Sequence, residues 1–203
     1  MICKYRGCLN LKSIELSDNL SLIAVDAFYG CSSLASIVLP PSIKNIYAGA
    51  FANCTSLASI TIPEGVTAIE WETFFGCRKL SSVELPSTIT SIGFQAFHWC
   101  FDLTTVVAKM LDPCEFERGS SFGYISNDCV LYVPAGTRDA YIAAGWTEDV
   151  FKGGVVEMNP TSVNSIEAEA TKDGDIYDLT GRRIAHKPAH GFYIQNGWKY
   201  LVR

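Results

Sequence analysis

The sequence predicts a solenoid in which short parallel β-strands and brief helical turns repeat at a fixed interval. The first observation is that five cysteines recur with a 23-residue period, at Cys8, Cys31, Cys54, Cys77 and Cys100. The second is that apolar residues recur in register with these cysteines, and the third is a proline at one position of most repeats. A fixed period of this length indicates stacked coils, because a single coil cannot bury its own apolar face.

Each repeat carries the same apolar positions. The columns are Leu11, Leu34, Leu57, Leu80 and Leu103; Ile14, Ile37, Ile60, Val83 and Val106; Leu16, Leu39, Ile62 and Leu85; Leu20, Ile43, Val66 and Ile89; and Ile23, Ile46, Ile69 and Ile92. A phenylalanine three residues before the cysteine closes a coil, at Phe28, Phe51, Phe74 and Phe97. Stacking places like residues over like, so we expect these columns to form the core.

Within one coil, the pattern predicts a strand that is followed by turns. In residues 34–39 the apolar residues are spaced to bury one face of a short extended segment, while Ser36 and Val38 point outward. Pro40 has no backbone N–H group to donate and therefore ends the strand. Residues 50–54 have the length for one helical turn before the next strand.

This repeat resembles the BspA-like family of leucine-rich repeats, which is found mostly on bacterial surfaces. The resemblance rests on Leu57-Ala-Ser-Ile60-Thr-Ile-Pro63, followed by Ile69, Phe74 and Cys77, and it covers about residues 3–108. It implies a right-handed leucine-rich repeat solenoid that acts as a non-enzymatic binding module, exported or displayed on the cell surface. It also implies that the partner is another protein, such as a host matrix component or the surface of another cell.

The array is predicted to span residues 1–108, because the 23-residue period ends there. Residues 109–128 are predicted to be irregular, and they are followed by a strand at 129–133 and a short helix at 138–144 with Thr137 as its N-cap. The stretch from Leu131 to Trp146 resembles the segment that commonly closes BspA-like arrays. Residues 109–156 are therefore predicted to cap the apolar end of the last coil.

The C-terminal part is predicted to be a polar linker at residues 157–173 and a small β tail at residues 174–203. Within the tail, Asn196 and Gly197 lie between two apolar stretches, which is a strong hairpin signal. The tail resembles the C-terminal segment of many secreted Bacteroidetes proteins, some versions of which are sorting signals. The residues that carry this resemblance are Tyr177-Asp-Leu-Thr-Gly-Arg-Arg183, Pro188, Gly191-Phe-Tyr-Ile194, Asn196, Gly197 and Lys199.

Composition excludes several other classes of protein. The net charge of −5 argues against nucleic acid or an anionic membrane as the main partner. No apolar run is long enough to span a bilayer, and no signal peptide is visible in this chain. Because the chain begins inside a repeat, we expect it to be a fragment of a longer protein.

The cysteines of the repeat are interpreted as small buried apolar residues rather than as disulfide partners. Stacked coils hold equivalent side chains about 4.8 Å apart, which is wider than the ~3.8 Å that a disulfide needs between Cβ atoms. A bond between Cys114 and Cys129, which lie outside the repeat, remains open. No CxxC motif occurs and the three histidines are scattered, so we expect no metal site and no cofactor.

We expect no enzymatic activity. The one suggestive pair is His98 with Cys100, but Cys100 occupies a core column, where a thiol is inert. The candidates for ligand binding are instead two sets of surface residues. One is a column of small hydroxyl side chains that includes Ser36, Ser59 and Ser82. The other is an aromatic cluster formed by Tyr47, Trp71 and Phe94, with Phe75 and Trp99 nearby.

Exposed aromatic side chains can stack on sugars or anchor a protein. One alternative to protein recognition is therefore a carbohydrate-binding surface protein that uses the aromatic cluster. Another is a structural spacer without a ligand of its own. In that case the serines are only small turn-compatible residues, and the aromatic side chains pack locally.

Overall fold

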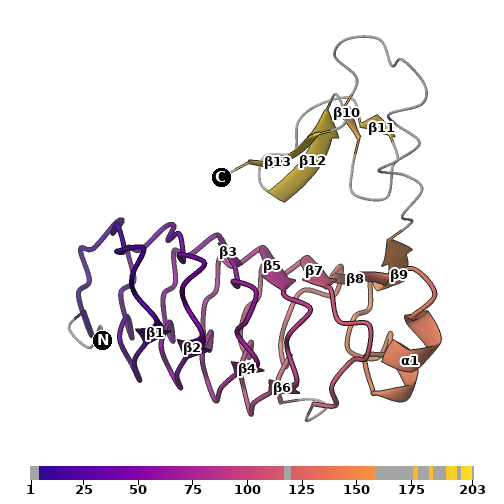
Figure 1. Ribbon diagram of the computed structural model, residues 1–203, viewed down its shortest axis with the longest axis horizontal. Helices are drawn as coiled ribbons and strands as arrows, with labels where there is room; N and C mark the ends of the chain where they lie inside the picture. Colours follow the sequence, from indigo (N-terminus) through magenta and orange to yellow (C-terminus); the bar gives the residue numbers. More distant parts are fainter. Residues whose placement is uncertain are drawn as a thin grey trace.

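Successive coils stack along one axis to form two walls of short strands (Figure 1). The computed structural model describes residues 5–116 and 120–158 in full, together with the backbone of four strands between residues 176 and 202. One wall is a parallel sheet of β3 (Ser59–Thr61), β5 (Ser82–Leu85), β7 (Thr105–Ala108), β8 (Val130–Pro134) and β9 (Gly154–Met158). The opposite wall pairs β1 (Leu22–Ile23) with β2 (Asn45–Ile46), and β4 (Ala68–Ile69) with β6 (Ser91–Ile92), again in parallel. This confirms the predicted solenoid.

We number the coils by the cysteine that opens each one, so that coil 1 begins at Cys8 and coil 5 at Cys100. Equivalent residues of coils 3, 4 and 5 pair in register, as Ile60 with Val83 and Val83 with Val106. The predicted core columns are buried: Ile60 is 4% exposed and Val106 0%. The alternation of side chains predicted a buried core and an outward Val38, which is 61% exposed.

The closing phenylalanines form a continuous stack through the interior. Neighbouring rings of Phe28, Phe51, Phe74 and Phe97 are nearly parallel, with centroids 5.2–5.5 Å apart. Tyr5 extends the stack at one end. Each fully buried aromatic ring removes a large apolar area from water, so this stack is a principal source of stability.

A sixth coil follows the five that the period predicts. Phe122 stacks on Phe97 at 5.0 Å although it lies two positions beyond the place that the period gives it. Leu131 of β8 pairs with Val106 with the same offset of two positions. The prediction that residues 109–128 are irregular was therefore wrong in part. Two additional residues end the 23-residue period, but the described residues of this segment continue the stack.

Two positions in each coil have a left-handed backbone. One column lies directly before the cysteine that recurs every 23 residues, which we call the ladder cysteine; it contains Gly7, Gly30, Asn53, Gly76 and Trp99, and Tyr124 at the end of coil 5. The other column contains Asp26, Gly49, Glu72 and Gln95. All these residues have φ between 54° and 73°. Because a positive φ stops helix propagation, the predicted helical turn takes the form of successive turns with i→i−3 hydrogen bonds, such as Cys54 N to Phe51 O.

The ladder cysteines hydrogen-bond to carbonyl groups 26 residues earlier in the chain. The thiols of Cys54, Cys77 and Cys100 donate to the carbonyl oxygens of Phe28, Phe51 and Phe74, at 3.1, 3.1 and 3.3 Å. A residue in this column thus fills a small apolar space and satisfies a buried carbonyl group. Cys114 and Cys129, whose pairing the sequence left open, are free thiols in the structure.

Aromatic side chains cover the C-terminal end of the described array. Trp146, Tyr141 and Phe151 are fully buried there, beside the helix α1 (Arg138–Ala143). The Tyr141 hydroxyl donates to the carbonyl of Met110 at 2.9 Å, and the Trp146 indole N–H donates to the carbonyl of Cys114 at 2.7 Å. Both bonds tie the helix region to the chain before β8.

The N-terminus of α1 is capped by a residue that the sequence did not indicate. Thr137 is the N-cap, but its side chain makes no capping bond and its hydroxyl instead donates to the carbonyl of Pro134 at 2.7 Å. The carboxylate of Glu157, from β9, accepts the backbone N–H of Arg138 at 3.0 Å. This hydrogen bond lowers the pKa of Glu157.

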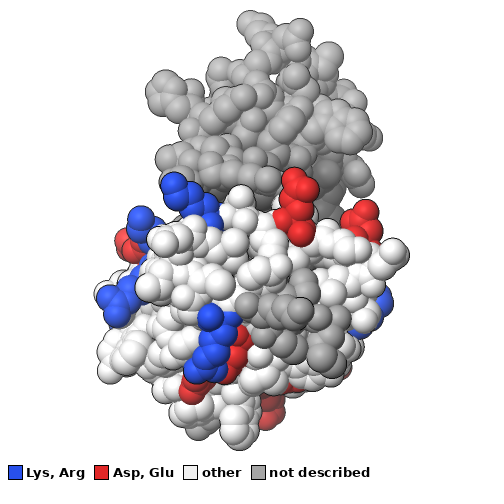
Figure 2. Space-filling model, turned by 90° about the vertical axis from the view of Figure 1, so that its left-hand side faces the viewer, with Lys and Arg blue, Asp and Glu red and all other residues white. Residues whose placement is uncertain are grey.

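The opposite end of the described array is only half covered. Side chains of coil 1 are partly exposed, whereas their counterparts in coil 2 are buried; the pairs are Leu11 and Leu34, Ile14 and Ile37, Leu16 and Leu39, and Leu20 and Ile43. Figure 2 looks at this end: much of the described surface is uncharged, and charged side chains of both signs are scattered around it.

The described strands of the C-terminal part form a separate antiparallel sheet. Its order is β11 (Arg183–Ile184), β10 (Ile176–Tyr177), β12 (Gly191–Gln195) and β13 (Trp198–Val202). Gln195 pairs with Trp198, which confirms the predicted hairpin pairing. The two turn residues of that hairpin lie outside the described residues, as does the predicted linker from residue 159 onward.

Candidate functional site

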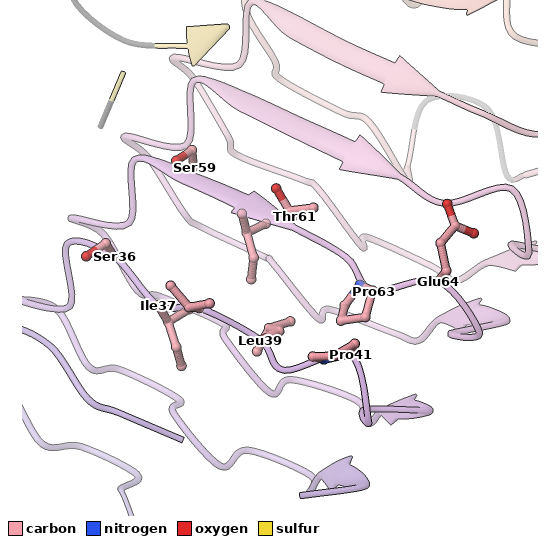
Figure 3. A pocket seen from close by; sticks show the side chains of 10 residues that line it. Ser36, Ile37, Leu39, Pro41, Ser59, Thr61, Pro63 and Glu64 are labelled. Carbon is pink, nitrogen blue, oxygen red and sulfur yellow. The ribbon is translucent and has the colours of Figure 1, made fainter. Parts of the chain in front are cut away.

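We call the wall that contains β3, β5, β7, β8 and β9 the strand wall. A slot of about 380 Å³ lies on this wall between coils 2 and 3 (Figure 3). Residues Ser36 to Leu39 with Pro41 line one side, and Ser59 to Thr61 with Pro63 and Glu64 line the other. Figure 3 shows the labelled side chains of these two coils on either side of the slot. The lining is largely apolar, with hydroxyl groups at its mouth.

The slot lies where the sheet ends. The five-stranded sheet begins at β3, so β3 is its edge strand, and the equivalent residues of coil 2 do not join the parallel ladder. The two coils still contact each other just before this point, because Ala58 N donates to Ala35 O at 3.2 Å. The slot thus lies where the parallel ladder is interrupted between coils 2 and 3.

The predicted hydroxyl column is divided by the structure. Ser36 and Ser59 are partly exposed and line the slot. Ser82, their counterpart in β5, is 4% exposed and does not line it. The exposed residues beside the two serines are Val38, at 61%, and Thr61.

Glu64 supplies a fixed negative charge at one end of the slot. Its carboxylate accepts the backbone N–H of Ser87 at 3.2 Å and the hydroxyl of the same residue at 3.0 Å. The Nζ atom of Lys109 lies 4.0 Å from Oε1 of Glu64, and Lys109 also forms an ion pair with Glu84. The slot therefore has apolar sides and an acidic end that coil 4 holds in place.

The predicted aromatic cluster is less uniform than its sequence suggests. Trp71 is 70% exposed and Phe94 41% exposed, and they occupy the same position of successive coils. Tyr47 is partly buried and belongs to the neighbouring column. The indole of Trp71 lies against the next coil: a Cβ atom at Gly93 would come within 2.7 Å of Trp71 Cδ1.

The structure places His98 and Cys100 in structural roles. His98 is 9% exposed, and its Nδ1 atom lies 3.0 Å from the carbonyl oxygen of Ser120. Burial raises the pKa of the Cys100 thiol, which disfavours the nucleophilic thiolate. Among residues 5–116 and 120–158, no group of three or more His, Cys, Asp or Glu side chains is placed to hold a metal ion. No helix in the described part of the chain could cross a membrane.

A second surface feature was identified from the sequence only in part, through Phe75 and Trp99 near the aromatic cluster. Trp99, Phe101 and Tyr124 are 40%, 45% and 68% exposed, and Phe75 lies 4.9 Å from Trp99 between ring centroids. We call these four residues the C-terminal corner. The signal in the sequence was the position before the ladder cysteine, where glycine or asparagine gives way to Trp99.

The comparisons with known proteins agree with the fold. A solved leucine-rich repeat protein of T. pallidum is 29% identical, with a TM-score of 0.54, and the match covers 64% of this chain and 58% of that one. A leucine-rich repeat protein of Bacteroides ovatus is 19% identical, with a TM-score of 0.37 and coverage of 62% and 48%. A leucine rich cell surface protein of Faecalibacterium prausnitzii is 25% identical, with a TM-score of 0.30 and coverage of 47% and 38%. No curated protein matches the chain.

The chain thus spans less than two thirds of the length of these solved relatives. The family model described as the BspA type leucine rich repeat region matches residues 3–114 in six copies, which is more than half of the chain. The protein belongs to the BspA-type leucine-rich repeat family.

Proposed function

We propose that this protein is a non-enzymatic recognition module that binds an extended segment of a partner protein along its strand wall. The observation that carries the proposal is the slot at the edge of β3. The segment would lie across the outer face of the wall, and apolar pockets there would select its side chains. The slot supplies such a pocket beside Val38 and Thr61.

The chemistry of the slot favours a segment with apolar side chains and a basic residue. Pro41, Pro63 and Val38 offer apolar contacts, and Ser36 and Ser59 can donate or accept hydrogen bonds. Glu64 lies at one end and would attract a lysine or arginine of the partner. A volume of about 380 Å³ suits one or two side chains rather than a folded domain.

We place this module outside the cell, exported or displayed on the surface, with a host matrix protein or another cell's surface as the partner class. Membership of the BspA-type family supports this location. The resemblance of residues 174–203 to C-terminal segments of secreted proteins adds to it, and in this proposal the tail sorts or anchors the chain. Protease treatment of intact cells that express the full protein checks the location, since only a displayed array is cleaved.

The test of recognition is saturable binding to a panel of matrix proteins, with Thr61→Arg as the informative variant. Thr61 is exposed at the slot, so an arginine there obstructs the slot while stability changes by about 0.5 kcal/mol or less. Ser91→Arg, at an exposed position on the opposite wall, is the matched control. We expect Thr61→Arg to weaken binding at least about tenfold and Ser91→Arg to leave it unchanged. Equal binding by all three proteins contradicts the proposal.

Carbohydrate binding by the predicted aromatic cluster is a second candidate, and the 70% exposure of Trp71 is the observation that favours it. A glycan array separates the two, because replacing Trp71 and Phe94 with serine removes glycan binding only in the second case. Absence of binding to both the matrix proteins and the glycan array would favour a structural spacer.

A further inference from the structure

We propose that the C-terminal corner is a binding site for a neutral saccharide, distinct from the slot on the strand wall. Two of its four residues line a hollow of about 480 Å³, a volume within the range of small-ligand sites. The exposed rings of Phe101 and Tyr124 border this hollow, and its polar lining includes Asn127, Asp149 and Lys152.

The backbone at this corner departs from the pattern of the array. At the end of coils 1 to 3 the left-handed position is occupied by glycine or asparagine, the residues that adopt it most readily. Trp99 and Tyr124 occupy it at the end of coils 4 and 5, with φ of 62° and 57°. Bulky side chains are disfavoured in this conformation, and such residues concentrate at functional sites.

Four of the aromatic side chains at this corner are joined by ring contacts. Phe75 and Trp99 lie 4.9 Å apart, His98 and Trp99 5.5 Å, and His98 and Tyr124 5.2 Å, measured between ring centroids. The contact between His98 Nδ1 and the Ser120 carbonyl, at 3.0 Å, holds the central imidazole ring in place. The side chains of Trp99, Phe101 and Tyr124 are nevertheless 40–68% exposed. Ring faces held in fixed positions and open to water suit the apolar face of a sugar ring.

Polar groups in the hollow can bind the hydroxyl groups of the same ligand. The Lys152 ammonium donates to Asn127 Oδ1 at 3.0 Å, which orients the amide and leaves its NH₂ group directed away from the lysine. Asp149 is exposed and contributes carboxylate acceptors, and the Tyr124 hydroxyl can donate or accept. The lining residues contain one ammonium group and one carboxylate, so the charges balance and a neutral ligand is favoured.

A few polar groups placed among aromatic rings are the usual means of orienting a small ligand. A protein partner would need a larger surface, with about 800 Å² contributed by each side. These observations favour a saccharide over a protein at the corner. The inference does not depend on the slot, which lies between coils 2 and 3 at the other end of the strand wall.

The test is isothermal titration of the full chain with uncharged oligosaccharides of glucose, mannose, galactose and xylose. We expect at least one to bind saturably and the double variant Trp99→Gly with Tyr124→Gly to bind it at least about tenfold more weakly. Glycine suits the left-handed backbone, so circular dichroism should show that this variant remains folded. Leu111→Ala, at an exposed apolar position that lines neither candidate site, is the matched control and should bind like the wild type. Phe94→Ala serves separately to test the predicted aromatic cluster.

Two results would overturn the inference. One is the absence of saturable binding by every neutral oligosaccharide. The other is unchanged binding by the double variant, and a loss of binding in Phe94→Ala would then move the sugar site to the predicted aromatic cluster. If no oligosaccharide binds and the double variant loses a protein partner, the corner is a protein-docking surface.

Discussion

The phenylalanine stack and the C-terminal corner use the same kind of side chain in opposite ways. In the stack, Phe51 and Phe74 repeat at one position, are fully buried and contact equivalent rings above and below. At the corner, Trp99 and Tyr124 replace glycine or asparagine, remain exposed and occupy a left-handed backbone. Residues that match the repeat pattern therefore stabilise the array. Residues that differ from the pattern, such as Trp99 and Tyr124, form the surface that we propose for binding.

The largest expected effect is that of removing a ring from the stack. Phe74 is fully buried between Phe51 and Phe97, so Phe74→Ala should lower the free energy of unfolding by about 3–5 kcal/mol. Its neighbour Phe75 is partly exposed and contacts Trp99 at the corner, so Phe75→Ala should cost about 1 kcal/mol. Urea unfolding followed by circular dichroism measures both. Equal losses would show that position in the repeat does not decide the energetic role.

Position along the array should produce the next largest difference. Ile60 is 4% exposed in the middle of the array, and Ile60→Ala should cost about 2–5 kcal/mol. Ile14, the equivalent residue of coil 1, is partly exposed, so Ile14→Ala should cost clearly less in the same 203-residue chain. Urea midpoints that fall equally in the two variants would contradict the half-covered state of coil 1.

The ladder cysteines predict a loss of stability at alkaline pH. Burial raises the pKa of the Cys54, Cys77 and Cys100 thiols above the ordinary value of 9.0. Thiols of the unfolded chain ionise above that value while the folded ones stay protonated. Their contribution is therefore complete below pH 9.0 and is lost as pH rises, by roughly 1.4 kcal/mol for each thiol per pH unit.

Urea midpoints at about pH 8 and about pH 10 measure this loss, and Cys77→Ala is the comparison because it lacks one buried thiol. The difference between the two pH values should shrink in that variant. Rapid labelling of the folded wild type by a thiol reagent at these three cysteines would argue that they are accessible, against the structure.

The smallest effect is expected at the exposed aromatic position on the opposite wall. Trp71 is 70% exposed, so Trp71→Ser should change the free energy of unfolding by about 0.5 kcal/mol or less. A loss of several kcal/mol would mean that the contact of its indole with Gly93 stabilises coil packing, and it would weaken the argument for a ligand there.

The sequence alone predicted the parts of the fold that depend on repetition. Ile60, Val83 and Val106 have equivalent neighbours in successive coils, so a pattern of residue types is sufficient to place them in the core. The sixth coil was missed because two additional residues shift Phe122 out of the 23-residue register. Glu157 was missed as the cap of α1 because its contact with Arg138 depends on how β9 and the helix pack.

The candidate sites were less predictable. Ser36 and Ser59 were named from their column, and they line the slot. The slot itself depends on the interruption of a backbone ladder, which side-chain alternation does not reveal, because coils 2 and 3 have the same pattern. The sequence indicated the corner only in part, through Phe75 and Trp99 near the aromatic cluster and the departure from glycine at Trp99. Its hollow involves residues from the cap that lie about 50 positions later.

The most direct test of the central claim is the relative stability of Trp99→Gly and Trp99→Ala. Both variants lose the indole and its contacts with Phe75 and His98, so they differ only in how readily the new residue adopts φ near 62°. We predict that the glycine variant is more stable than the alanine variant by about 1 kcal/mol in urea unfolding, since alanine pays the left-handed penalty. A more stable alanine variant would contradict the account, because it would mean that Trp99 does not oppose the backbone preference of the array.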